Sequence, residues 1–60
     1  MIDILIVEDD TELSALLTDF LRNKGYTVSA AAGGEYAIAL FEKYGARLVI
    51  LDINLPDVNG

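Results

Sequence analysis

The chain has 60 residues, ten of them acidic against four basic, so its net charge is -6, and it contains neither cysteine nor histidine. This charge argues against direct binding to nucleic acid or to an anionic membrane surface. Without thiolate or imidazole ligands, a metal site in this chain would be built from oxygen atoms and would favour Mg²⁺, Ca²⁺ or Mn²⁺. The apolar fraction of 53% is typical of a chain that forms a core. No apolar run is long enough to span a membrane, and the first residues lack the basic region of a signal peptide, so we expect one small cytoplasmic domain.

The first part of the chain predicts a strand followed by a helix. Residues 2–7 form an apolar run broken only by Asp3, which is typical of a buried strand. Apolar residues then recur at helical spacing between Leu13 and Leu21, which predicts an amphipathic helix. Asp10 or Thr11 is expected to cap this helix at its start, and a left-handed Gly25 to end it.

The second part of the chain repeats the alternation of strand and helix. Residues 26–30 alternate apolar with small polar side chains, which favours a strand at the edge of a sheet. Helical spacing returns between Ala37 and Tyr44, and Gly45 is expected to close this helix. Residues 48–51 are an uninterrupted apolar run that predicts a strand buried on both faces, and Asp52 follows directly.

Strands that alternate with helices predict an α/β fold with a parallel sheet. Because the second strand alternates and the other two are apolar apart from Asp3, we expect the strand order 2-1-3. Right-handed crossovers then place the two helices on opposite faces of the sheet, and a crevice opens between the carboxyl ends of the first and third strands. This crevice would receive Glu8 and Asp9 from one strand and Asp52 from the other.

Three converging carboxylates repel one another unless a cation lies between them, and Mg²⁺ is commonly held by one or two carboxylates, a backbone carbonyl and water. The alternative is that the acidic residues only cap the following helix and favour its positive end. Capping is the favoured interpretation for Asp10, and both interpretations stay open for Glu8. For Asp9 together with Asp52 we favour the metal site.

The order of these motifs resembles the amino-terminal half of a response-regulator receiver domain, the phosphorylated module of two-component signalling. The resemblance covers all of residues 1–60 and implies a flavodoxin-like, receiver-type sheet, present here as a βαβαβ half-domain. The segments that carry it are Ile4-Leu5-Ile6-Val7-Glu8-Asp9-Asp10, Leu16-Leu17, Gly25-Tyr26-Thr27-Val28, Gly34-Glu35-Tyr36-Ala37 and Leu48-Val49-Ile50-Leu51-Asp52-Ile53-Asn54-Leu55-Pro56-Asp57, with Gly60.

The resemblance implies a role for each residue of the crevice. Asp52 matches the phospho-acceptor, which takes a phosphoryl group from a sensor histidine kinase or phosphotransfer protein. Asp9 matches a direct ligand of Mg²⁺, Glu8 a ligand that acts through water, and Asn54 a ligand through its backbone carbonyl. Phosphoryl transfer of this kind needs positioning and charge neutralisation more than covalent chemistry. The implied function is that of a signalling module and not of an enzyme.

The same resemblance implies that residues 1–60 are a truncated receiver. The Ser or Thr and the Lys that bind the phosphoryl group in receivers follow the fourth and fifth strands of that family. We therefore expect the 60-residue chain not to complete the usual phosphorylation-driven switch. We also expect the open edge of the third strand to favour self-association. Ala46-Arg47 replaces the common Pro-Asp before that strand, which is a surface difference.

Two other functions remain open from the sequence. A Mg²⁺-dependent phosphohydrolase of the haloacid-dehalogenase type also uses an Asp at the end of a strand as its nucleophile. Members of that family carry the motif Asp-x-Asp at this point, whereas this chain has Asp52-Ile53-Asn54. A phosphohydrolase of this type would also give Glu8 and Asp9 no role. The second alternative is a non-catalytic receiver fragment that acts only by association.

Overall fold

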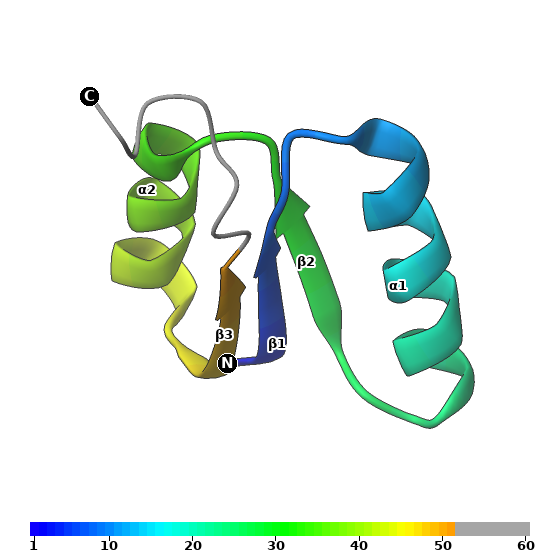
Figure 1. Ribbon diagram of the computed structural model, residues 1–60. Coiled ribbons are helices and arrows are strands. Elements are labelled where there is room, and N and C mark those ends of the chain that lie inside the picture. Colours follow the sequence, from blue (N-terminus) through cyan, green and yellow to red (C-terminus); the bar gives the residue numbers. More distant parts are fainter. Residues whose placement is uncertain (52–60) are drawn as a thin grey trace.

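The computed structural model describes residues 1–51. Three strands and two helices alternate along them: β1 (Ile2–Val7), α1 (Thr11–Asn23), β2 (Val28–Ala31), α2 (Gly34–Tyr44) and β3 (Ala46–Leu51). The strands form one parallel sheet in the order β2-β1-β3, with α1 and α2 on its opposite faces (Figure 1). The predicted α/β class, strand order and placement of the helices are therefore confirmed. Neither helix of the described residues is long and apolar enough to cross a membrane.

The register of the sheet brings the carboxyl ends of all three strands to one edge. Val7, the last residue of β1, is the register partner of both Ala31 in β2 and Leu51 in β3. The strands therefore end at the same level, although β1 and β3 are more than forty residues apart in the sequence. The last residues of β1 and β3 therefore lie side by side at this edge.

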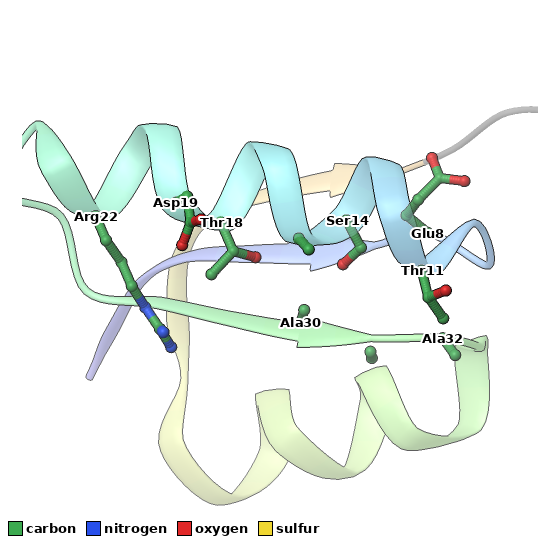
Figure 2. A pocket seen from close by; sticks show the side chains of 10 residues that line it. Glu8, Thr11, Ser14, Thr18, Asp19, Arg22, Ala30 and Ala32 are labelled. Carbon is green, nitrogen blue, oxygen red and sulfur yellow. The ribbon is translucent and has the colours of Figure 1, made fainter.

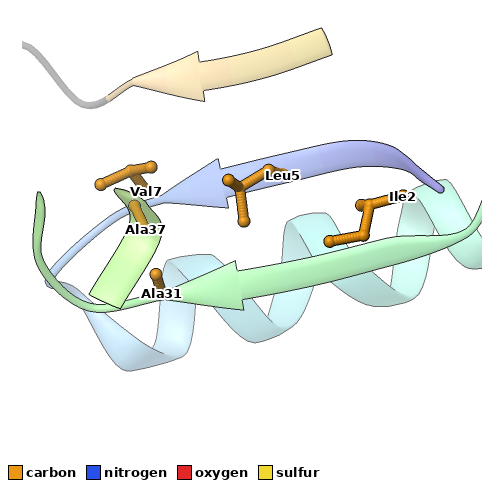
Figure 3. Packing of buried hydrophobic residues seen from close by; sticks show 5 residues of the cluster. All are labelled: Ile2, Leu5, Val7, Ala31 and Ala37. Carbon is orange, nitrogen blue, oxygen red and sulfur yellow. The ribbon is translucent and has the colours of Figure 1, made fainter. Parts of the chain in front are cut away.

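Alternate residues of β1 supply the core on each face of the sheet, as the period of two in a strand requires. On the α2 face, Leu5 and Val7 are buried with Ala31 and Ala37 (Figure 3). Ile2, the first residue of the strand, belongs to this same cluster and so departs from the alternation. The cluster on the α1 face consists of the buried residues Ile4, Ile6 and Val28, against which Leu17, Leu21 and Ile50 pack. β1 is thus the strand buried on both faces.

The expectation that the third strand is buried on both faces is wrong for the described residues. No residue of β3 is buried, and the side chains of Leu48 and Leu51 are 54% and 61% exposed. The reason is that α1 and α2 pack over β1 and β2, which leaves β3 as an uncovered edge of the described sheet. The apolar side of α1 is likewise only partly buried, because Leu16 and Phe20 remain exposed.

The second strand begins two residues later than the alternation predicts, at Val28 and not at Tyr26. Thr27, just before it, is held by Asp3. Its amide donates to Oδ2 of Asp3 at 2.9 Å, and its carbonyl accepts from the amides of Asp3 and Ile4, each at 3.0 Å. These bonds tie the entry of β2 to β1 before the regular pairing of the two strands begins. The third strand instead begins earlier than predicted, at Ala46, which pairs with Ile2.

The ends of the helices follow from their capping residues. Oδ1 of Asp10 accepts from the amides of Glu12 at 3.0 Å and Leu13 at 3.1 Å, so Asp10 and not Thr11 is the N-cap of α1. Gly25 has a φ of 98° and its amide donates to the carbonyl of Arg22 at 2.9 Å, which matches the predicted left-handed stop. Gly45 ends α2 with a positive φ of 73°, and its amide donates to the carbonyl of Phe41 at 2.8 Å.

Replacing Ile6 by Ala is expected to lower the free energy of unfolding by about 2–5 kcal/mol, because a fully buried side chain leaves a cavity. Ile6 is 0% exposed. Leu16→Ala is the matched control on the α1 side of the sheet, since this leucine is 67% exposed and its loss should change stability by about 0.5 kcal/mol or less. Urea unfolding followed by circular dichroism measures both changes. Equal losses for the two variants would contradict the assignment of the core.

Replacing Asp10 by Ala is expected to cost about 1 kcal/mol of stability, because the amides of Glu12 and Leu13 lose their side-chain acceptor. Asp10→Asn keeps an acceptor oxygen and is expected to remain close to the unchanged protein. Hydrogen exchange at these two amides, read together with urea unfolding, distinguishes a lost cap from a general loss of charge. If Asn and Ala were equally destabilising, the capping assignment would fail.

Candidate functional site

The predicted site residues Glu8 and Asp9 lie in the turn between β1 and α1, at the carboxyl edge of the sheet. The amide of Glu8 donates to the carbonyl of Ala31 at 3.0 Å, so the contact between β1 and β2 continues one residue beyond β1. This bond holds the backbone of Glu8 in line with the sheet. Its side chain is only 8% exposed, which makes it the buried charged residue of the described chain.

The buried carboxylate of Glu8 contacts the backbone two residues further along the chain. Its Oε2 accepts from the amide of Asp10 at 3.1 Å. A buried carboxylate requires hydrogen-bond donors to offset the loss of hydration, and this amide is one of them. The bond also fixes the direction in which the chain leaves β1.

Asp10 completes the turn from the helix side. Its carboxylate caps α1, and its carbonyl accepts the first helical bond, from the amide of Ser14 at 2.9 Å. Asp9 therefore lies between two residues whose backbones are held by hydrogen bonds, that of Glu8 to β2 and that of Asp10 to α1. Asp9 itself is exposed, and within residues 1–51 no hydrogen bond involves its carboxylate. Asp9 and Asp10 are both exposed, but the carboxylate of Asp10 is engaged as the cap of α1, whereas that of Asp9 has no such role within residues 1–51.

The remaining predicted site residues, Asp52 and Asn54, lie outside the described residues. The last described residue of β3, Leu51, is the register partner of Val7, so the point at which β3 ends lies beside the point at which β1 ends. Residues 1–51 contain no group of three side chains able to hold a metal ion. The predicted convergence of Glu8, Asp9 and Asp52, with the backbone carbonyl of Asn54, stays a prediction.

The donors that are described suit a hard divalent cation. Cysteine and histidine are absent from this chain, so its side-chain ligands are oxygen atoms. Among residues 1–51, the carboxylate of Asp9 accepts no hydrogen bond and lies next to the buried carboxylate of Glu8. Mg²⁺ typically keeps several waters and takes one or two carboxylates from the protein. Glu8 and Asp9 would hold such an ion together with oxygens from elsewhere, and its charge would offset their mutual repulsion.

An open pocket of about 420 Å³ lies between α1 and β2, and the sequence did not predict it. Thr11, Ser14 and Thr18 line it from α1, and Figure 2 shows Glu8 and Thr11 at one end and Arg22 at the other. Nη2 of Arg22 donates to the carbonyl of Val28 at 3.0 Å near that far end. The signal in the sequence is the recurrence of small hydroxyl residues at helical spacing, opposite the apolar side of the helix.

Comparison with known proteins places the chain in a family. The model of the family "Response regulator receiver domain" matches residues 4–60. The regulatory protein VanRc of Enterococcus gallinarum is 42% identical over 57 residues, which cover 95% of this chain and 25% of that protein. The transcriptional regulatory protein TrcR of Mycobacterium tuberculosis is 42% identical over 59 residues, which cover 98% of this chain and 23% of that protein.

A third relative, the TorCAD operon transcriptional regulatory protein TorR of Escherichia coli K12, is 42% identical over 57 residues, or 95% of this chain and 25% of that protein. The chain thus spans about a quarter of the length of the curated relatives it matches. No solved structure is significantly similar to it. The parallel sheet of order β2-β1-β3, the acidic turn at its carboxyl edge and the match over residues 4–60 together show that the chain belongs to the response regulator receiver domain family of two-component systems.

Proposed function

We propose that this chain is the phospho-accepting module of a two-component phosphorelay, in which Asp52 takes a phosphoryl group from a sensor histidine kinase or a phosphotransfer protein in the presence of Mg²⁺. The observation that carries the proposal is the pairing of Val7 with Leu51 at the carboxyl edge of the sheet. The acidic turn directly follows the first of these residues, and Asp52 directly follows the second in the sequence. Ligand sites of open α/β sheets lie at this kind of edge, where the direction of the chain across the sheet reverses.

The proposed transfer moves the phosphoryl group between two protein side chains. A carboxylate oxygen of Asp52 forms a bond to phosphorus while the bond from phosphorus to the imidazole nitrogen of the donor breaks. The electron pair of that bond remains on the imidazole, and Asp52 becomes an acyl phosphate. The chain is therefore a substrate of the transfer and not an enzyme, and we place the reaction in the cytoplasm with the donor protein.

In this proposal, Asp9 and Glu8 in the β1–α1 turn contact the cation in different ways. Asp9 is exposed and suits a direct bond to Mg²⁺, whereas Glu8 is buried and its Oε2 already accepts from the amide of Asp10. We therefore assign Glu8 a contact through water. The backbone carbonyl of Asn54 is proposed as a further ligand on the resemblance to receiver domains alone. When bound, the ion supplies positive charge to the equatorial oxygens of the phosphoryl group.

The phosphohydrolase alternative has less support than the receiver. The receiver family matches residues 4–60, and a phosphohydrolase of the type considered gives no role to the ordered turn at Glu8 and Asp9.

Replacing Asp52 by Asn is expected to abolish phosphorylation, because an amide oxygen is a poor nucleophile and cannot form an acyl phosphate. The protein is incubated with Mg²⁺ and a phosphorylated kinase or a small phosphoramidate that carries radiolabel, and incorporation is counted. The label in the unchanged protein should be released by hydroxylamine, which cleaves acyl phosphates and leaves phosphoesters intact. Asp19→Asn removes the same charge from the exposed side of α1 and should retain labelling. Full labelling of the Asp52 variant would overturn the proposal.

Replacing Asp9 by Asn is expected to weaken Mg²⁺ binding at least about tenfold, since changes around metal sites typically cost 10–100-fold in affinity. Titration with Mg²⁺, followed through the amide resonances of Asp10 and Glu12, measures this affinity without any phosphoryl donor. Asp19→Asn is again the control, because it lowers the negative charge of the chain by the same amount. Equal weakening in both variants would show a diffuse charge effect and contradict a site at Asp9.

We also propose that the 60-residue polypeptide associates with a second copy of itself through β3. The specific observation is the exposure of this strand on both faces, together with its position at the edge of the described sheet. On the α2 side, Val49 and Leu51 line an apolar groove of about 390 Å³ with Ile38 and Phe41. An edge strand with apolar faces is a template for pairing with another strand.

Replacing Leu48 by Lys is expected to shift the polypeptide towards the monomer, because a charged side chain on an edge strand opposes pairing. Leu16→Lys on α1 places the same charge at a similarly exposed leucine and should leave the association unchanged. Sedimentation over a series of protein concentrations gives the monomer fraction of each variant. A folded monomer at every concentration of the unchanged polypeptide would contradict the association, as would dissociation by the α1 variant alone.

A further inference from the structure

We draw no further inference here: the strongest candidate, the open pocket between α1 and β2 that Thr11, Ser14 and Thr18 line, carries nothing, because its lining is a stripe of small residues on one helix face and its buried carboxylate, that of Glu8, already accepts a hydrogen bond from the Asp10 amide.

Discussion

The structure depends on the pairing of β1 with a parallel strand on each of its edges. Through this pairing β1 supplies core residues to both faces of the sheet, with Leu5 and Val7 on one side and Ile4 and Ile6 on the other. The same pairing sets the level at which β2 and β3 end, because Val7 is the partner of Ala31 and of Leu51. The burial of β1 and the position of the candidate site thus both follow from the register of the sheet. A slip of one residue would exchange the two faces of β1 and would also separate the strand ends.

The turn after β1 holds the carboxylate of Asp9 at the edge of the sheet, where it is exposed to solvent. Glu8 is anchored to β2 through its backbone, and its side chain holds the amide of Asp10. Asp10 in turn begins α1 through its side chain and its carbonyl. The exposed Asp9 is consequently positioned by both neighbours while its own oxygens remain available to solvent. Positioning by surrounding residues is the feature that a site for a small, strongly hydrated cation requires.

Local signals in the sequence were sufficient for the order of the elements, the strand order and the caps at Asp10 and Gly25, because each depends on hydrophobic period or on a single side chain. The burial of β3 could not be predicted in this way. An apolar run shows that a strand can be covered, but the packing of the helices over β1 and β2 decides whether it is covered. The later start of β2 escaped prediction for a similar reason, since the bond from Thr27 to Asp3 joins residues far apart in the sequence.

For the candidate site, the sequence predicted that Glu8 and Asp9 lie at the carboxyl edge of the sheet, and the structure places them there. The hydrogen bond from the Asp10 amide to the Glu8 carboxylate could not be predicted in this way, because it depends on the exact path of the backbone through the turn.

The exposed position of β3 has a thermodynamic consequence for the proposed site. The acids of the turn belong to β1 and α1, whereas the proposed acceptor follows β3 in the sequence. In the proposed site, the two halves would come together only when β3 is paired with β1, and β3 has the least burial in the described sheet. By linkage, any ion that binds both halves adds its binding free energy to the docking of β3. Occupancy of the proposed site and docking of the third strand would then be coupled equilibria, so that a change in one shifts the other.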